Sequence, residues 1–168
     1  KSPQQIECMR AAGRLTAMTV AELKKAIHPG ITTGELDALA EKFITSHGGI
    51  PSFKGYQGFP GSICASVNDE VVHGIPGVRE VKTGDIISID IGVTYDGYVG
   101  DSAFTAAVGE VSAEALKLLR ITEEALHKGI ARALVGGRLS DIGHAVESHA
   151  KSAGFSVVRD YVGHGIGA

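Results

Sequence analysis

Residues 85–108 read DIISIDIGVTYDGYVGDSAFTAAV, and this stretch decides the predicted fold. Two runs rich in β-forming residues flank the dipeptide Asp96-Gly97. Such a dipeptide is typical of the two-residue turn of a β-hairpin, because glycine accepts the positive φ that this turn requires. We therefore predict an antiparallel hairpin with Tyr95 opposite Tyr98, so that the numbers of paired residues add up to 193.

Two carboxylates fall on one face of this hairpin. Side chains alternate across a strand, so Asp90 and Asp101 share the polar face as diagonal neighbours, with backbones roughly 7–8 Å apart. Carboxylates at that spacing repel each other unless positive charge lies between them, and both can reach inward to bridge two cations about 3.5–4 Å apart. Gly92 is expected opposite Asp101 and would leave space for the cations, whereas a bulge at Gly100 would shift the pairing. The alternative is that Asp90 only solubilises an edge strand and that Asp101 belongs to the turn.

The opposite face of the hairpin and the flanking helices are predicted to build the core. That face carries Ile87, Ile89, Ile91, Val93, Tyr95, Tyr98 and Phe104. Capping residues and glycine stops delimit the helices. Before the hairpin we expect a helix over residues 3–27 with a capping box at Ser2 and Gln5, a helix from the capping box at Thr32 and Glu35 to Gly48, and extended segments within residues 63–75. After the hairpin we expect a helix from Ser112 to Gly136, a helix capped by Ser140 that ends at Gly154, and a strand over residues 155–158.

These elements predict an α/β domain with an internal repeat. A long helix, a glycine break, a shorter capped helix and an extended run with one histidine occur twice. We expect residues 1–168 to form one domain, with a first pseudo-repeat over residues 1–110 and a partial second one over residues 111–168. The second copy has no hairpin of its own, so we expect that the chain is truncated and holds only half of a central site.

Composition restricts the class of protein. The chain has 168 residues, of which 43% are hydrophobic and 21% charged, enough for one ordinary core. No apolar run approaches the roughly 18 residues of a membrane span, and no signal peptide is visible. The net charge is −3 with scattered Lys and Arg, so neither DNA nor a membrane is an expected partner. Cys8 and Cys64 are too few for a disulfide scaffold, so we expect a cytoplasmic protein.

Two histidines are candidates for chemistry. His164 lies between Gly163 and Gly165, where a neutral imidazole suits a transition metal and the glycines allow a cation to approach. It could equally be ordinary loop polarity, or the glycine-rich run could cradle a phosphate. His73 follows a short hydrophobic run and precedes a turn, so it could project into a cleft as a proton donor or hydrogen-bond partner. A packed structural histidine remains the alternative there.

Three further side chains could line an apolar pocket. Tyr56, Phe59 and Cys64 occur on or after a glycine-rich connection between the second helix and the first extended segment. A binding pocket is lined mainly by apolar and aromatic side chains. Plain packing within the core explains the same residues, and the pattern alone favours that interpretation.

Three segments resemble a known family. SICASVNDEVVHGIP over residues 62–76, GDIISIDIGVTYDGYVGDSAFT over residues 84–105 and YVGHGIG over residues 161–167 resemble, in this order and spacing, type I methionine aminopeptidases of the pita-bread fold. The opening helix pair is similar too, so the resemblance covers essentially the whole chain. No large insertion separates the segments, which favours type I over type II. The resemblance implies a pseudo-twofold α/β fold with a dinuclear metal site at the centre of the sheet.

The resemblance also implies an activity and its residues. Such enzymes remove the initiator methionine from nascent polypeptides with water activated by two divalent ions, here Co, Mn, Fe, Zn or Ni. By matching motif, Asp90 and Asp101 would be metal ligands with Asp101 bridging, and His164 would be the histidine ligand. His73 would contact the substrate near the scissile amide and help to stabilise the tetrahedral intermediate. The methionine pocket would be lined by Tyr56, Phe59 and Cys64.

The chain departs from the family pattern after GHGIG. The family site needs two further glutamates and a second histidine downstream of that motif, and these are absent from residues 1–168. We therefore expect the chain alone to bind metal weakly, to turn over poorly and to expose apolar surface unless its missing C-terminal segment completes the fold. Two alternatives remain: a non-catalytic binding module of the same fold, and a proline-specific dipeptidase.

Overall fold

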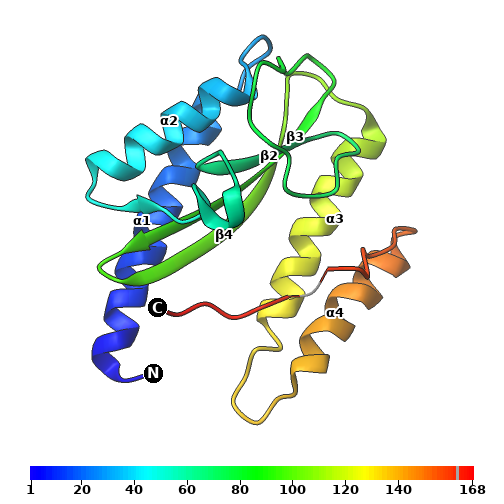
Figure 1. Ribbon diagram of the computed structural model, residues 1–168. Helices are drawn as coiled ribbons and strands as arrows, with labels where there is room; N and C mark the ends of the chain where they lie inside the picture. The colour runs from blue at the N-terminus through cyan, green and yellow to red at the C-terminus, as the bar shows by residue number, and fades with distance from the viewer. Residues whose placement is uncertain (162) are drawn as a thin grey trace. The chain divides into compact units, whose positions relative to one another are not determined.

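The computed structural model describes residues 1–161 and 163–168. Contacts divide them into two compact units: Lys1–Val111 together with Gly165–Ala168, and Ser112–His164 (Figure 1). The pseudo-repeat expected from the sequence stays a prediction. Among the described helices, none is both long and apolar enough to cross a membrane.

The first unit is built on a four-stranded antiparallel sheet. Its strands are β1 (Ile50–Pro51), β2 (Ile63–Val67), β3 (Ile86–Tyr95) and β4 (Tyr98–Ala107). β4 pairs with β3 along its whole length, whereas β1 and β2 pair with successive parts of β3 on the other edge. β3 therefore has partners on both sides and lies inside the sheet.

The hairpin register predicted from the sequence is confirmed. Tyr95 pairs with Tyr98, and further along the ladder the pairs are Val93–Gly100, Gly92–Asp101 and Asp90–Ala103. Asp96 and Gly97 both have positive φ, 50° and 77°, as a primed two-residue turn requires. The ladder continues through Gly100 without a bulge, so the turn chemistry alone sets the faces of both strands.

Helices α1 (Pro3–Ala26) and α2 (Thr33–Ser46) begin where the sequence predicts. The Ser2 hydroxyl accepts from the Gln5 amide at 3.2 Å, and the Gln5 side chain accepts from the Ser2 amide at 2.7 Å. The same reciprocal capping box joins Thr32 and Glu35, at 3.1 and 2.8 Å. Each box satisfies amide groups that a helix start leaves without intrahelical partners.

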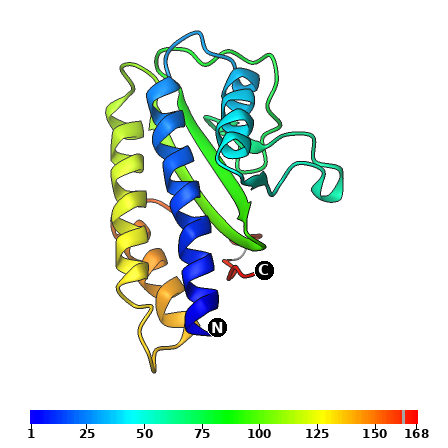
Figure 2. The same cartoon turned by 90° about the vertical axis from the view of Figure 1, so that its left-hand side faces the viewer.

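The predicted core face of the hairpin is buried against these helices. Ile87, Ile89, Ile91 and Val93 are 0% exposed. Figure 2 shows α1 lying along the strands of the hairpin. The approach is close at Gly100, where an added Cβ would lie 2.4 Å from the Thr16 hydroxyl oxygen. Apolar burial on one face therefore leaves the other face of the hairpin for polar residues.

The second unit contains α3 (Ala113–Ile130) and α4 (Leu139–Ser152). The predicted cap at Ser112 is confirmed, since its hydroxyl accepts from the Ala115 amide at 3.1 Å. Two predictions are wrong here. α3 ends at Ile130, before Gly136, and α4 is capped at Arg138, with Ser140 already inside the helix. The reason for the earlier start is that the Asp141 carboxylate accepts from the Arg138 amide at 2.9 Å.

The predicted strand over residues 155–158 is also wrong. These residues follow α4 without regular structure. The Phe155 amide bonds to the Ala150 carbonyl at 3.0 Å, and the Lys117 ammonium lies 5.1 Å from the centre of the Phe155 ring. An isolated strand is not stable without a pairing partner, and among the described residues this run pairs with no strand.

Candidate active site

The two predicted acids lie on the polar face of the hairpin, both partly buried. Asp90 comes from β3 and Asp101 from β4. Burial, and then the negative charge of Asp101, raises the pKa of the Asp90 carboxyl to about 6. The negative charge of Asp101 thus makes ionisation of Asp90 less favourable. The register that brings the acids together is confirmed, whereas their role as metal ligands stays a prediction.

The donor set fits a divalent cation. Two carboxylates that repel each other on a partly desolvated face are stabilised by a positive charge between them, and carboxylate oxygens suit Mn²⁺ and similar ions. Within residues 1–161 and 163–168, however, no group of three His, Cys, Asp or Glu side chains is arranged to hold a metal ion. His164 belongs to the second unit, whereas Asp90 and Asp101 belong to the first.

His73 lies on the loop that follows β2, with an exposed side chain. Its backbone has a φ of 59°, a region that non-glycine residues seldom adopt. It is near enough to Asp90 to contribute to lowering the pKa of that carboxyl, against the larger effect of burial. The structure therefore brings His73 into electrostatic range of the acid pair.

Cys64 lies directly opposite Asp90 on β2 and is 5% exposed. Burial, and then the charges of Asp90 and Asp101, raises the pKa of its thiol to about 12. The thiol therefore stays protonated at neutral pH and cannot act as a thiolate nucleophile. It instead offers a soft, neutral lining group next to the acids.

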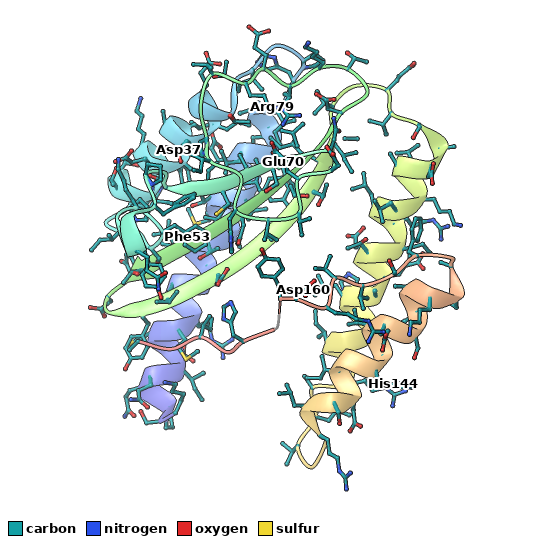
Figure 3. The ribbon with its side chains drawn as sticks, turned by 45° about the vertical axis from the view of Figure 1, so that its right-hand side comes forward. Asp37, Phe53, Glu70, Arg79, His144 and Asp160 are labelled. Carbon is teal, nitrogen blue, oxygen red and sulfur yellow. The ribbon has the colours of Figure 1, made fainter. Side chains whose placement is uncertain are left out.

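The space above Gly92 is not open, contrary to the expectation from the sequence. An added Cβ at Gly92 would lie 2.6 Å from the Phe53 ring and 3.0 Å from the Ser52 Cβ. Ser52 is held there by a hydroxyl contact with Thr94 at 2.8 Å and by donation from its amide to the Gly92 carbonyl at 2.9 Å. Phe53, labelled in Figure 3, is therefore a residue of this face that sequence reasoning missed.

Tyr56 and Phe59 belong to a short loop around the 3-10 turn η1 (Tyr56–Gly58). The Gly55 amide donates to the Phe59 carbonyl at 2.8 Å and closes this loop. Tyr56 is 67% exposed, whereas Phe59 is half-buried. The structure does not enclose Tyr56 in a pocket, and the pocket role of both residues stays a prediction.

Asp37 of α2 fixes the start of β2 and was also missed by sequence reasoning. One of its carboxylate oxygens, Oδ1, accepts from the Ser62 amide at 2.7 Å and from the Ile63 amide at 3.0 Å. An acid among apolar helix positions gave no signal of a tertiary contact. The contact places β2, and with it Cys64, beside β3.

Because both amides bond to one oxygen of Asp37, the charge itself is expected to matter little. Asp37→Asn keeps a carbonyl oxygen at that position and is expected to change the free energy of unfolding by less than about 1 kcal/mol. Asp37→Leu leaves two amides without an acceptor and is expected to cost about 2–3 kcal/mol. Urea unfolding followed by circular dichroism measures both variants, and equal losses would contradict this account.

Ser62 has an unusual hydroxyl. The residue is 0% exposed, and within the described part of the chain its Oγ has no hydrogen-bond partner. A buried hydroxyl without a partner carries a desolvation cost of about 1–3 kcal/mol. Ser62→Ala is therefore expected to raise the free energy of unfolding by about 1 kcal/mol in the same urea experiment. A loss of stability would show that the hydroxyl has a partner in solution.

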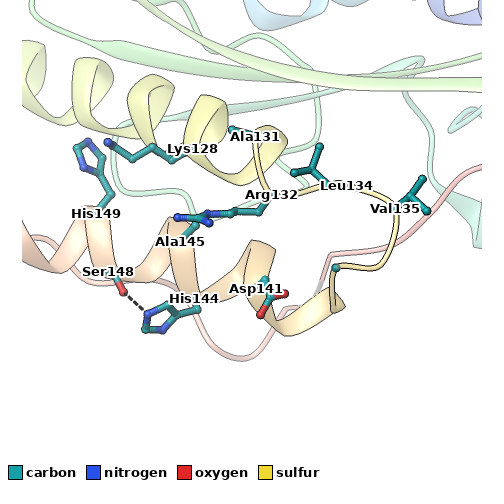
Figure 4. Close-up of a pocket in the computed structure, with 11 residues that line it drawn as sticks. Lys128, Ala131, Arg132, Leu134, Val135, Asp141, His144, Ala145, Ser148 and His149 are labelled. Carbon is teal, nitrogen blue, oxygen red and sulfur yellow. Dashed lines mark hydrogen bonds between the residues drawn. The ribbon is translucent and has the colours of Figure 1, made fainter.

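A separate groove lies in the second unit (Figure 4). It has a volume of about 870 Å³ and is lined by side chains of α3, α4 and the connection between them, including Lys128, Arg132, His144 and His149. His149 contacts the Glu124 carboxylate at 2.8 Å. The groove contains none of the residues predicted from the sequence, so it is not the candidate site.

The chain matches the family model described as metallopeptidase family M24 over residues 7–168. It is 59% identical over 167 residues to methionine aminopeptidase 1 of Bacillus subtilis, covering 99% of the chain and 67% of that relative. It is 53% identical over 168 residues to the methionine aminopeptidase of Clostridium acetobutylicum, again covering 99% and 67%. The chain therefore spans about two thirds of the length of these curated relatives.

Comparison with solved structures gives relatives of the same kind. The methionine aminopeptidase of Rickettsia prowazekii superposes with a TM-score of 0.94 at 43% identity, covering 99% of this chain and 67% of that one. The prolidase of Pyrococcus furiosus has a TM-score of 0.85 at 21% identity, covering 99% and 48%, which shows the fold alone. The chain belongs to the methionine aminopeptidases of metallopeptidase family M24.

Membership confirms several predictions from the sequence. The pita-bread α/β fold and the class of hydrolase are confirmed, and the two alternatives, a binding module and a proline-specific dipeptidase, are not favoured. As an aminopeptidase the protein acts on peptide N-termini, and as an M24 metallopeptidase it uses divalent metal ions.

Proposed function

We propose that this chain contributes to removal of the initiator methionine from nascent polypeptides, with Asp90, Asp101 and His164 as ligands of two divalent ions. The observation that carries the proposal is the acid pair: the charge of Asp101 helps to raise the pKa of Asp90 on a partly buried face. The metal ions, when bound, supply polarisation of the scissile carbonyl and activation of water. Free Cys8 and Cys64 are consistent with action in the cytoplasm.

The residues around the acids are proposed to hold the substrate. His73 would donate a hydrogen bond at the scissile amide, where negative charge develops on the carbonyl oxygen. Tyr56, Phe59 and Cys64 would surround the methionine side chain, and Phe53 adds an apolar surface next to them. The protonated thiol of Cys64 suits this role because a neutral sulfur packs favourably against a thioether.

We further propose that full activity requires ligands from outside residues 1–168. The described residues hold no complete metal-binding group. The resemblance implies two further glutamates and a second histidine. The chain's own missing C-terminal segment, which would carry them, is therefore the proposed partner of these residues, besides the peptide substrate.

The test compares the chain alone with the chain joined to the C-terminal third of the Bacillus subtilis relative. With added Mn²⁺ or Co²⁺, the joined protein is expected to hydrolyse Met-Ala-Ser and not Ala-Pro, while the chain alone turns over at least about 100-fold more slowly. Calorimetry is expected to give two ions for the joined protein. Metal binding without hydrolysis of Met-Ala-Ser would overturn the proposed activity, and absence of metal binding would favour a non-catalytic module.

A further inference from the structure

The loop that carries His73 is attached to β2 next to that residue. The Gly74 amide donates to the Ser66 hydroxyl oxygen at 3.1 Å, and the Ala65 amide donates to the Gly74 carbonyl at 2.9 Å. Ser66 is 4% exposed, so its hydroxyl lies in a nearly dry environment. Bonds of this kind are stronger away from water, and a buried amide without an acceptor is costly.

The attachment is close and leaves little freedom. A Cβ added at Gly74 would lie 2.3 Å from the Ala65 carbonyl oxygen and 3.0 Å from the Ser66 Cα. The backbone of the loop therefore rests directly on the backbone of β2. His73, immediately before this contact, has a φ of 59°, which a non-glycine residue keeps only when its surroundings fix it.

Apolar packing does not hold this part of the loop. Val72 and Ile75, on either side of the contact, are 43% and 65% exposed. The loop is also anchored at its two ends. At the start of the loop, the Glu70 carboxylate accepts from the Val67 amide at 2.7 Å and pairs with Arg79 at 2.6 Å (Figure 3). At the end of the loop, the Gly34 amide donates to the Gly77 carbonyl at 2.8 Å. Between these ends, the bond from the Gly74 amide to the Ser66 hydroxyl ties the residue next to His73 to a side chain of β2.

We propose that Ser66 is a positioning residue of the active site, whose hydroxyl sets the backbone of Gly74 and thereby the direction of the His73 imidazole. The inference rests on the proposed role of His73 at the scissile amide. Without the hydroxyl, the Gly74 amide has to turn to water, and the backbone at His73 loses one of the contacts that hold its positive φ. The imidazole then samples orientations that do not reach the substrate.

Ser88 provides a matched control. It lies directly opposite Ser66 across β2 and β3, so both side chains share the polar face of the sheet. Its hydroxyl contacts the Thr105 hydroxyl at 2.8 Å, away from the His73 loop. Ser88→Ala and Ser66→Ala remove the same atom from neighbouring positions, and only Ser66→Ala removes the acceptor of the Gly74 amide.

The first test uses the metal-free chain and needs no catalysis. Ser66→Ala is expected to speed hydrogen exchange of the Gly74 amide by about tenfold and to shift the NMR resonance of the His73 Cε1 proton. Ser88→Ala is expected to change neither, and Ser66→Thr, which keeps a hydroxyl, is expected to keep exchange slow. Unchanged exchange in Ser66→Ala, or equal acceleration in Ser66→Thr, would overturn the proposal.

The second test uses the joined protein and Met-Ala-Ser. Ser66→Ala is expected to lower kcat about tenfold with KM changed less than about twofold, and to add no loss in a His73→Ala background. If Ser66→Ala lowers kcat by the same factor in the His73→Ala background as in the unchanged protein, Ser66 acts only on stability, which overturns the positioning role. If the unchanged joined protein fails to turn over, the proposed function fails, while the exchange experiment still decides the role of Ser66.

Discussion

Replacing Asp90 by asparagine is expected to weaken binding of Mn²⁺ by at least about 100-fold. The substitution keeps the shape of the side chain and removes the charge that a divalent ion neutralises on this face. Calorimetric titration of the joined protein, which carries the full expected ligand set, measures the effect. Asp96→Asn is the control, because Asp96 is an exposed acid of the same hairpin, at a positive φ that asparagine also adopts.

The same substitution is expected to have the opposite effect on stability without metal. The pKa of Asp90 in the folded chain is raised from 3.8 to about 6. Asp90 therefore favours the folded state fully below about pH 4, and this contribution is lost as the pH rises through about 6. Because asparagine does not titrate, Asp90→Asn is expected to be more stable than the unchanged chain at pH 7.5, by about 1–2 kcal/mol after allowance for partial solvent exposure.

Urea unfolding in the presence of a chelator measures this difference. The advantage of Asp90→Asn is expected to be largely lost at pH 3.5, where the carboxyl is mostly protonated in both states. If Asp96→Asn shows the same pH-dependent gain, the effect comes from net charge and the acid pair is not its source. If Asp90→Asn in the joined protein binds Mn²⁺ as tightly as the unchanged joined protein, Asp90 is not a ligand.

Gly100→Ala is expected to cost about 3 kcal/mol of unfolding free energy. The new Cβ would lie 2.4 Å from the Thr16 hydroxyl oxygen and 2.8 Å from the Ala12 backbone. The hydroxyl can rotate, but the helix backbone cannot move without lifting α1 from β4, and overpacking of this kind typically costs about 1–3 kcal/mol. Thermal unfolding followed by circular dichroism measures the loss.

Gly13→Ala is the matched control for Gly100→Ala. Gly13 lies next to Ala12 on the same helix, and an added Cβ there has no atom within 4 Å. Alanine inside a helix is favoured over glycine by about 0.5–1 kcal/mol, so this variant is expected to be more stable. A loss in both variants would show that the loss in Gly100→Ala is not specific to the contact between β4 and α1, and a gain in both would show that β4 and α1 separate easily.

The parts of the fold that were predicted correctly depend on local chemistry. Asp96-Gly97 sets the turn and hence the faces of β3 and β4, and the two capping boxes set the starts of α1 and α2. Each of these signals lies within a few residues of the element that it specifies. The acid pair was predictable for the same reason, because register alone determines which side chains are neighbours.

The parts that were missed depend on contacts far apart in sequence. Phe53 reaches the acid face through β1, a strand of two residues that has no pattern of its own. Asp37 bonds to amides 25 and 26 residues away. Residues 155–158, which were wrongly predicted to form a strand, have the composition of a strand but no pairing partner among the described residues. Local propensity cannot supply such information, since tertiary contacts override it.

The first unit is discontinuous in sequence: Gly165–Ala168 belongs to it, and the Val99 amide donates to the Gly167 carbonyl at 2.8 Å. This has a consequence for folding during synthesis. Residues 1–111 contain every strand of the sheet, yet one bond of β4 forms only after the whole second unit has been made. Contacts of such sequence separation form late. This one bond at the edge of β4 is therefore missing while the helix pair is translated, and the Val99 amide stays available to other partners during that time.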